Sequence, residues 1–448
     1  MQALTLFWFR RDLRLQDNAG LYHALKSKFP VLPLFIFDTD ILDELDDPQD
    51  ARVSFLHNCV QDLQAQLQEL GSSMLVRYGK PREIWAQILE EFAIAEVYTN
   101  HDYEHKAIQR DEQVKALLTE RHIPFYTFKD QVIFEKLEVT KADGGPYTVF
   151  TPYSRTWKTK LLSHMEKLEG AGEEAISFYL KPYPCEKYYA NFHQIPPLPL
   201  PALSAMGFHT SNIDIPPNTV SRGLIKTYDK TRDFPYLLGT SRLGIHFRFG
   251  TISIREKARR ALELNETFLN ELIWRDFYAQ ILANFPHVAK GSFRPEYDRI
   301  EWRNDEKEFE KWCQGKTGYP IVDAGMRELN QTGFMHNRVR MITASFLTKH
   351  LLIDWRWGEA YFAKKLLDFD LASNNGGWQW AAGCGTDAAP YFRVFSPAAQ
   401  QEKFDPEYKY VRKWVPEYGT AAYPKPIVDH KMARERCLEV YKIALKPL

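Results

Sequence analysis

The chain has 448 residues, which is long enough for two domains and for an interior that encloses a large ligand. Its 58 basic and 58 acidic residues give a formal net charge of +0, so composition offers no global argument for nucleic-acid binding and any such site must be a local patch. The five cysteines are odd in number, scattered and without a CxxC pair, which argues against a disulfide framework and against a zinc or other metal site.

The N-terminal sequence and the hydropathy of the chain indicate the cellular compartment. The opening sequence MQALTLFWFRR has neither a charged n-region nor a cleavage site, and no apolar run approaches membrane-spanning length. Together with the scattered cysteines, this predicts a soluble cytoplasmic protein that does not associate with membranes.

Over the first 130 residues, short apolar or β-rich runs alternate with amphipathic segments such as residues 52–70 and 81–92. This alternation predicts a doubly wound parallel α/β sheet. No GxGxxG follows the first strand, so the usual dinucleotide-binding fingerprint is missing. We therefore expect the sheet to be a structural platform and not the catalytic centre. The expected strands are residues 4–9, 31–37, 74–79, 96–100 and about 125–128.

A proline-rich stretch separates this region from the rest of the chain. Eight of the 26 prolines lie between Pro182 and Pro217, which predicts an extended connector. From about residue 218 the pattern becomes helical, for example over 267–282 and 337–352. The predicted domains are an α/β domain at 1–130, an inter-domain linker at 131–217 and an all-helical domain at 218–448.

A pair of hydroxyl residues precedes a predicted helix at Thr240-Ser-Arg-Leu-Gly244, after Tyr228 and the turn Arg232-Asp-Phe-Pro. Helix N-termini leave backbone amides unpaired and carry a partial positive charge, so they suit a pyrophosphate. An ordinary N-cap is the more common meaning of such a pair.

The segment Glu271-Leu-Ile-Trp-Arg-Asp-Phe-Tyr278 places Glu271, Trp274 and Arg275 on one helical face. That face combines a carboxylate, a large aromatic surface and a guanidinium. The alternative is a structural Glu–Arg pair beside a partly buried tryptophan.

The segment Met335-His-Asn-Arg-Val-Arg-Met341 places Asn337, Arg340 and Met341 on one helical face, while Arg338 projects elsewhere. One face can therefore line a pocket while Arg338 reaches a phosphate. The alternative is a pair of solvated arginines.

Residues Asp368–Trp380 contain two acids, two adjacent amides, a glycine pair and two tryptophans, and run on into Cys384–Arg393. Polar side chains at this density cost free energy if they are buried without partners. We therefore expect them to bind a planar ligand that takes part in electron transfer. Eight of the eleven tryptophans lie after residue 270, which favours stacking or redox chemistry, although large helical cores also collect tryptophan.

These segments, in this order, resemble DNA photolyases and cryptochromes. The likeness extends from Trp8–Asn18 to Pro397 and the segment Glu402–Asp405. It implies a helical domain that binds one FAD per chain, active as FADH⁻. The cofactor-binding residues that the resemblance implies are Tyr228, Thr240, Ser241, Arg242, Leu243, Gly244, Glu271, Asn337, Arg340, Asp368, Asp370 and Asn374.

The resemblance also implies a pocket for a pyrimidine dimer flipped out of the duplex. Glu271 would hydrogen-bond the damaged base, and Trp274 and Trp380 would form two aromatic walls. Asn337 and Met341 would line the same pocket. The residues that would contact DNA, besides the two walls, are Arg232, Arg275, Arg338, Arg393 and Lys403.

Beside the flavin ring, the resemblance pairs Arg340 with Asp368, places Asp370 at the polar edge and places Asn374 opposite N5. A neutral amide can bond N5 without adding negative charge near an anionic flavin. The resemblance further implies an electron-transfer chain in which Trp378 is nearest the flavin, Trp355 is intermediate and Trp302 is at the surface. Helical-core packing is the alternative for each of the three.

Asn374, the two tryptophan walls and the Asn337–Met341 pair favour a class I cyclobutane pyrimidine dimer photolyase over a six-four photolyase or a cryptochrome, and no disordered extension is seen after Phe404. The expected function is light-driven repair of UV-damaged DNA by electron transfer from excited FADH⁻, in a monomer with no obligate protein partner. The alternatives are a cryptochrome-type blue-light photoreceptor and a light-independent nucleotide-binding protein.

The family resemblance leaves a second chromophore open. Phe35–Leu42 and Arg52 resemble the antenna region of the N-terminal domain. The Asn-Glu pair that helps to bind methenyltetrahydrofolate in some members is replaced near Lys106-Ala107. The antenna could therefore be a deazaflavin, a second flavin or a folate, or the cleft could be empty.

Overall fold

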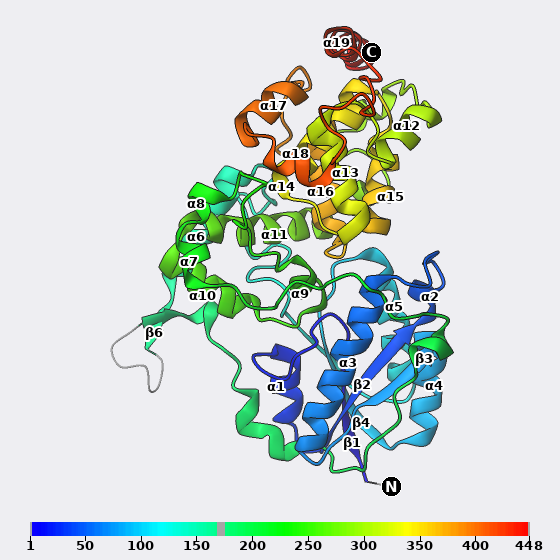
Figure 1. Ribbon diagram of the computed structural model, residues 1–448. Helices are drawn as coiled ribbons and strands as arrows, with labels where there is room; N and C mark the ends of the chain where they lie inside the picture. The colour runs from blue at the N-terminus through cyan, green and yellow to red at the C-terminus, as the bar shows by residue number, and fades with distance from the viewer. Residues whose placement is uncertain (1, 168–174, 447–448) are drawn as a thin grey trace. The chain divides into compact units, whose positions relative to one another are not determined.

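The computed structural model describes residues 2–167 and 175–446 (Figure 1). The chain forms two compact units, and each unit is assembled from three segments of the sequence. Unit 1 comprises Met1–Glu135, Trp157–Asn218 and Leu243–Glu263, and unit 2 comprises Lys136–Thr156, Thr219–Arg242 and Leu264–Leu448.

A five-stranded sheet forms the centre of unit 1. Its strands are β1 (Leu4–Phe9), β2 (Val31–Asp38), β3 (Leu75–Gly79), β4 (Ile94–Asn100) and β5 (Phe125–Phe128). Their order is β3-β2-β1-β4-β5 and every neighbouring pair is parallel, which confirms the doubly wound sheet. β1 and β2 are buried along their whole length, because helices cover both faces of a doubly wound parallel sheet. Their near-continuous apolar sequence follows from this burial.

Besides the sheet, unit 1 contains several helices and a short pair of strands (Figure 1). They are α1 (Ala19–Leu25), α2 (Thr39–Leu42), α3 (Ala51–Glu69), α4 (Pro81–Glu91), α5 (His105–Glu120), β6 (Met165–Lys167), β7 (Ala175–Ser177), α9 (Gly244–Phe249) and α10 (Ile254–Leu264). Trp8 of β1 packs edge-on against Trp85 of α4, with ring centroids 5.5 Å apart, so the apolar face of α4 anchors it to the sheet.

Four buried charges, the unit 1 ion cluster, tie separate segments of unit 1 together. Asp130 receives Arg14 Nη2 at 2.7 Å and Arg255 Nη2 at 2.8 Å, and Arg255 Nε bonds Asp17 at 2.8 Å. Burial opposes ionisation of Asp130, but Arg14 and Arg255 lower its pKa to about 2. Buried charges persist when they are paired and hydrogen-bonded in this way.

The segment 131–217, predicted as a linker, is not extended throughout. It contains helix α6 (Phe150–Ser163), which contributes residues to both units, and the 3₁₀ turns η1 (Phe178–Leu180), η2 (Cys185–Asn191) and η3 (Leu203–Met206). The proline-rich part runs along unit 1, where Gln64 Nε2 donates to the Leu198 carbonyl at 2.8 Å. Prolines lack the N–H that a strand needs, so the contact is made by isolated bonds, such as the one from the Leu198 N–H to Ser73 Oγ at 2.9 Å. The domain limits at 130 and 217 stay predictions.

The named elements of unit 2 are helices. They are α7 (Arg222–Lys226), α8 (Tyr228–Thr231), α11 (Glu266–Asn284), η4 (Pro286–Ala289), η5 (Pro295–Arg299), α12 (Glu306–Cys313), α13 (Pro320–Thr332), α14 (Asn337–Ser345), η6 (Phe346–His350), α15 (Trp355–Lys365), α16 (Leu371–Ala382), α17 (Pro397–Phe404), α18 (Lys409–Trp414) and α19 (His430–Ala444). The expected combination of an α/β region and an all-helical region is confirmed.

Helix α16, formed by the polar and tryptophan-rich stretch, packs against α11, α14 and α15. Two close approaches require small residues. A Cβ at Gly376 would lie 2.2 Å from the Tyr278 ring of α11, and a Cβ at Gly358 of α15 would lie 2.1 Å from the Trp378 ring. The motif therefore lies among three helices, and each of them carries other predicted site residues.

No helix in the described residues is both long and apolar enough to cross a membrane. Within residues 2–167 and 175–446, no group of three or more His, Cys, Asp or Glu side chains is arranged to hold a metal ion.

Candidate functional site

The N-terminus of α16 carries the two predicted acids. Asp370 is its N-cap, and its Oδ1 accepts the Ser373 N–H at 3.1 Å. Arg340 Nη2 of α14 donates to both carboxylate oxygens of Asp368, to Oδ1 at 3.1 Å and to Oδ2 at 2.9 Å. Arg340 Nε donates to the Met335 carbonyl at 2.8 Å. The predicted Arg340–Asp368 pair is therefore present, and it joins α14 to the segment that precedes α16.

Asn374 is held by a residue that the sequence did not single out. Its Nδ2 donates to Glu359 Oε1 at 2.9 Å and to the Glu359 carbonyl at 3.1 Å. Burial raises the pKa of Glu359, and the bond from Asn374 opposes that rise. Because Glu359 occupies the amide nitrogen, Asn374 Oδ1 is left as the acceptor that can face a ligand N–H.

Glu271 of α11 forms an ion pair with Arg232. Burial raises the pKa of Glu271, and Arg232 counteracts part of this shift. Arg232 also lies 4.0 Å from Asp233. Glu271 is therefore poised to hold a proton more readily than an exposed glutamate, which suits a hydrogen bond to a base carbonyl.

Trp274, one helical turn after Glu271, is half-buried and one face of its ring is already covered. Phe150 stacks on that face with ring centroids 3.7 Å apart and an interplanar angle of 2°. Phe277 and Tyr278 pack nearby, with centroid distances of 5.5 and 5.4 Å. Only the opposite face of Trp274 can receive a base. Phe150 lies far away in sequence and inside no recognised motif, so only the fold reveals this contact.

Trp380 is half-buried on α16, and its nearest aromatic ring is that of Phe395, with centroids 6.4 Å apart. Trp274 and Trp380 thus come from α11 and α16, two helices in direct contact. Arg275, also on α11, is half-buried.

At the start of α14, Asn337 is exposed and Met341 is half-buried. Arg338 does not project freely. It donates to Asp233 at 2.7 Å, contacts Met341 Sδ at 3.7 Å and lies 4.4 Å above the Phe404 ring.

His336, the N-cap of α14, has a buried nitrogen without a partner. Its Nδ1 accepts the Arg338 N–H at 3.1 Å, which leaves the ring proton on Nε2. Nε2 has no hydrogen-bond partner in the described part of the chain. Burial lowers the pKa of His336 to about 4, so the ring is neutral at pH 7. An orphaned buried donor of this kind indicates a missing acceptor.

The predicted phosphate-binding loop is divided between the units, because Thr240, Ser241 and Arg242 belong to unit 2 and Leu243 and Gly244 to unit 1. Leu243 occupies the N-cap position of α9 without a side-chain cap, and Gly244 is the first residue of that helix.

The hydroxyl groups of Thr240 and Ser241 are half-buried and make no hydrogen bond within the described residues, so they are available to a ligand. Arg242 lies 4.3 Å above the Phe334 ring, and the ring of Tyr228 packs edge-on against Phe268.

The cations predicted to bind DNA fall into two groups. Arg232 and Arg338 are both paired with acids of unit 2, and their contact with DNA stays a prediction. Their partners, Glu271 and Asp233, lie too close for either guanidinium to remain unpaired. Arg393 and Lys403 are exposed.

The predicted electron-transfer tryptophans are all in unit 2. Trp378 and Trp355 are 2% exposed, whereas Trp302 is half-buried and lies edge-on to Tyr441 at 6.1 Å. Trp302 is thus more exposed than the other two, while the order of Trp378 and Trp355 stays a prediction. The rings in contact with Trp378 are Phe362 at 5.0 Å and Trp312 at 6.0 Å, and the Trp312 contact was not foreseen.

These groups fit a ligand that presents both donors and acceptors. Thr240, Ser241 and His336 offer hydroxyl and N–H groups, while Asn374 offers a carbonyl oxygen. A pyrophosphate requires donors, and a reduced flavin ring presents N–H groups to an acceptor. The donor set therefore fits FAD.

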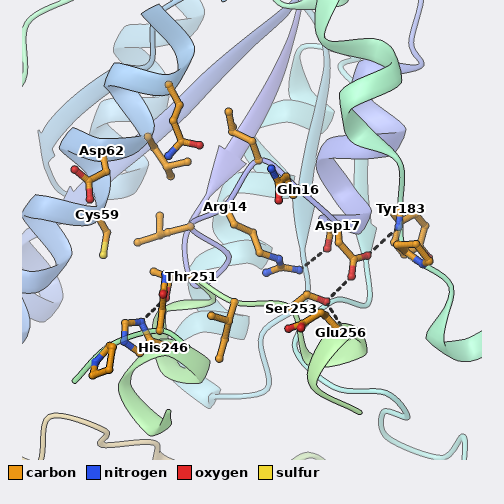
Figure 2. Close-up of a pocket in the computed structure, with 18 of the residues that line it drawn as sticks. Arg14, Gln16, Asp17, Cys59, Asp62, Tyr183, His246, Thr251, Ser253 and Glu256 are labelled. Atoms are coloured by element: carbon orange, nitrogen blue, oxygen red, sulfur yellow. Dashed lines mark hydrogen bonds between the residues drawn. The ribbon is translucent and has the colours of Figure 1, made fainter. Parts of the chain in front are cut away.

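Unit 1 contains a separate cavity of about 920 Å³ (Figure 2). Some of its polar groups bond one another: Asp17 receives Ser253 Oγ and the Tyr183 N–H, and His246 bonds Thr251. The described residues that line it come from unit 1 alone and do not include the antenna-like segment Phe35–Leu42.

Near that antenna-like segment, Asp38 caps α2 and lies 3.5 Å from Arg110, while Arg52 pairs with Asp50. Lys106, at the position where the folate-binding pair is replaced, pairs with Glu44.

Comparisons with known proteins agree with this arrangement. Residues 5–170 match the family model described as DNA photolyase, and residues 268–422 match the FAD binding domain of DNA photolyase. Two similar curated relatives are named deoxyribodipyrimidine photo-lyase: the Escherichia coli protein is 37% identical over 98% of this chain and 99% of its own length, and the Halobacterium salinarum protein is 36% identical over 98% and 99%.

Similar solved structures include a bacterial class III photolyase from Agrobacterium tumefaciens, with a TM-score of 0.83, 32% identity and coverage of 100% of this chain and 98% of that chain. An archaeal photolyase from Sulfolobus tokodaii with two FAD molecules has a TM-score of 0.79 and 34% identity, over 98% and 100%. A cryptochrome from Synechocystis has a TM-score of 0.82 and 26% identity, over 98% and 99%.

Proposed function

The chain belongs to the DNA photolyase family of DNA-repair enzymes, and we propose that it splits cyclobutane pyrimidine dimers in DNA by light-driven electron transfer. The observation that carries the proposal is the packing of α16 against α11. It brings the helix of Asn374 and Trp380 against the helix of Glu271 and Trp274. Cofactor residues and lesion residues thus come from adjoining helices.

Bound FAD, in its reduced form, supplies the electron that light transfers to the dimer. Thr240, Ser241 and His336 would donate hydrogen bonds to its polar groups. Asn374, fixed by Glu359, would present Oδ1 to the N–H of the reduced ring. Because the amide is neutral, it adds no negative charge beside an anionic flavin. The Arg340–Asp368 pair joins α14 to the segment before α16 and would lie beside the flavin ring.

The lesion would enter between Trp274 and Trp380. A dimer is weakly stacked and paired in the duplex, so extruding it costs less than extruding an intact base. Phe150 supports the back of Trp274 and keeps that ring from turning. Glu271, whose pKa is raised by burial, would hydrogen-bond the base carbonyl on which charge develops. Asn337 and Met341 would complete the pocket wall.

Phosphate contacts would come first from Arg393 and Lys403, which are exposed. Arg232 reaches DNA only after Glu271 turns to the lesion and releases it, and Arg338 only after it leaves Asp233. Arg275 adds a further guanidinium on α11. Such contacts bind backbone without reading sequence, so affinity should fall with salt.

Oxidised flavin would be reduced through Trp378, Trp355 and Trp302. The glycine contact at Gly358 brings the Trp378 ring onto α15, the helix that begins at Trp355. Trp302, which is half-buried, would be the residue that an external reductant reaches.

We also infer a second chromophore in unit 1, because the similar Sulfolobus tokodaii photolyase contains two FAD molecules. Phe35–Leu42 and Arg52 remain the residues proposed for it. We propose that the protein is a monomeric photolyase of class I. The similar Agrobacterium tumefaciens structure is a class III photolyase, so experiment must distinguish the two classes.

The direct test is repair of a duplex oligonucleotide that contains one thymine dimer, with purified, chemically reduced protein, under blue light and in darkness. The proposal requires dimer loss under light only. Equal repair in darkness, or none under light by a protein that has bound FAD, would overturn it. Glu271→Gln should slow repair at saturating DNA while the flavin content stays unchanged.

A second candidate function is a cryptochrome-type blue-light receptor, which the similarity to the Synechocystis cryptochrome favours. It predicts light-driven reduction of bound flavin without loss of dimers. The same assay, read for both flavin reduction and repair, separates the two functions.

A further inference from the structure

Helix α14 continues into η6, a single π-helical turn with a buried lysine at its end. The Leu351 N–H bonds the Phe346 carbonyl at 3.1 Å, which is the wide i→i+5 spacing of a π turn. The extra residue rotates the side chains that follow, and Lys349 lies inside the helical core with 2% exposure. Burying an ammonium group costs free energy unless it is hydrogen-bonded, so the burial of Lys349 needs a structural or functional explanation.

The ammonium group of Lys349 holds one backbone atom of a distant loop. Its Nζ donates to the Arg393 carbonyl at 3.1 Å, and Nζ makes no other hydrogen bond in the described residues. Arg393 lies between α16 and α17, in residues 388–395, named here the 388–395 loop. Internal bonds join the Arg393 N–H to the Pro390 carbonyl and the Val394 N–H to the Phe392 carbonyl. Within the described residues, Lys349 makes the only hydrogen bond that reaches this loop from outside it.

The 388–395 loop carries groups placed to meet DNA. Phe392 is 61% exposed, and the Arg393 side chain is exposed while its carbonyl faces inward to Lys349. Phe395 packs next to Trp380, the proposed second wall of the lesion pocket. Tyr391 stacks on Tyr441 at 5.8 Å, which fixes one end of the loop by packing.

The surroundings of Lys349 leave its charge only partly compensated. Burial lowers the pKa of Lys349 to about 8, while the nearby thiols of Cys384 and Cys437 act in the opposite direction. Burial raises the pKa of Cys384 to about 12 and that of Cys437 to about 11, so both stay protonated near pH 8.

Other polar groups near this turn are His350, His430 and Arg436, together with buried Tyr441, whose hydroxyl donates to the Ala382 carbonyl at 2.9 Å. His350 bonds His430 at 2.8 Å, and Arg436 donates to the His350 carbonyl at 2.6 Å. Burial lowers the pKa of His350 to about 3, so it is neutral near pH 8. Arg436 remains charged there.

We propose that Lys349 is a positioning residue for damaged DNA: by holding the Arg393 carbonyl, it sets the 388–395 loop so that Phe392 and Arg393 meet the duplex and Phe395 supports Trp380. This inference rests on the proposed function, since it assigns the loop to DNA. The bond uses the backbone of Arg393 and therefore leaves its guanidinium to a phosphate. A core that needed only packing would be served equally well by an apolar side chain of the same length.

The test compares Lys349→Met with Lys431→Met, which removes the same charge from an exposed position on α19. The full-length protein with bound flavin is titrated in darkness with dimer-containing duplex. Loss of one charge-assisted hydrogen bond predicts about tenfold weaker binding by Lys349→Met and no change by Lys431→Met. Flavin content should be equal in all three proteins, and the melting temperature of Lys349→Met should equal or exceed that of the wild type, because a buried charge has been removed.

Two further readouts separate positioning from mere packing. Wild-type affinity should fall as the pH rises from 7 to 9, since the lysine loses its charge, whereas Lys349→Met should lose this pH dependence. Amide hydrogen exchange at Arg393 and Val394 should be faster in Lys349→Met. The inference is wrong if Lys349→Met binds damaged DNA within a factor of about two of the wild type and shows the same pH profile. A factor of about two in affinity is close to the error of a measured binding free energy.

If the wild-type protein itself fails to bind damaged DNA, the proposed function falls, and the role of Lys349 is then decided by hydrogen exchange in the free protein. Faster exchange in the 388–395 loop for Lys349→Met, but not for Lys431→Met, supports positioning. Equal exchange overturns it. If Lys349→Met does not fold, the wild-type pH profile and Lys349→Gln replace it, with the same expected loss of affinity.

Discussion

In unit 1, Asp130 bonds Arg14 and Arg255 with side-chain exposures of only 1%, 9% and 6%, whereas in unit 2 Arg340 and Asp368 keep 25% and 22% of their surface exposed. In the first set each charge faces an opposite charge of the protein, and Arg14 Nε is the one polar side-chain atom among them that is buried without a hydrogen-bond partner in the described residues. The second set stands beside groups such as His336 Nε2 that have no protein partner in the described structure. Buried polar residues therefore form a framework in the unit 1 ion cluster, whereas the group around Arg340 includes a buried donor that remains available to a ligand.

The largest expected effect follows from breaking the unit 1 ion cluster. Asp130→Ala would leave Arg14 and Arg255 buried without their shared partner, which should cost about 3–5 kcal/mol of unfolding free energy. The matched change in unit 2, Asp368→Ala, should cost at most about 1 kcal/mol, because that pair is partly solvated. Urea denaturation of both variants measures the difference. Equal losses would contradict the contrast between the units.

The next effect concerns the lesion wall. Trp274→Ala should weaken binding to dimer-containing DNA by roughly 1–3 kcal/mol, the usual value of one base–aromatic stack, and should leave the flavin bound. Phe150 contacts the opposite face of the ring, so Phe150→Leu should weaken binding less. Titrations of both variants in darkness give the values. Unchanged affinity in Trp274→Ala would remove this residue from the pocket.

A smaller effect is expected from acid. The pKa of Asp130 is lowered to about 2 in the folded protein, from an ordinary value of 3.8. The folded form therefore binds fewer protons than the unfolded form between these values, and the stability contributed by Asp130 is present above pH 4 and lost as the pH falls toward 2. Asp130→Asn should show a flatter decline of the melting temperature over this range. Parallel curves for the two proteins would argue against the lowered pKa.

The smallest effect on repair is expected at the outer tryptophan. Trp302→Phe should impair light-driven reduction of oxidised flavin but leave repair by chemically reduced protein unchanged, since the aromatic contact of Trp302 is with Tyr441 of α19 and not with a proposed lesion residue. Trp414→Phe, a half-buried tryptophan outside the series, is the control and should alter neither. If repair by reduced Trp302→Phe protein also fails, the electron-transfer role is misassigned.

The framework was predictable because it depends on local patterns. Each expected strand of unit 1 is confirmed within two residues, since a strand buried on both faces leaves an apolar run in the sequence. The Arg340–Asp368 pair was reached through the family resemblance and is present. The predicted helix at 337–352 instead ends as α14 at Ser345 and gives way to the π turn η6, which no residue pattern announced.

Contacts made across the fold could not be predicted. The stacking of Phe150 on Trp274 and the bonds from Asn374 to Glu359 join residues from different helices. The pairing of Arg232 with Glu271, 39 residues away, was not foreseen, because it depends on how α8 meets α11. Tertiary packing decides these positions.

The most direct test of the account is an absorption spectrum of the purified protein before and after illumination with an external reductant, followed by release and quantification of any flavin. We expect at least one FAD per chain, bound by the ligand groups described in unit 2, and loss of the oxidised flavin bands in light. A colourless protein that takes up no FAD on reconstitution, although it is folded, would contradict the central claim that the open polar groups of unit 2 hold a flavin.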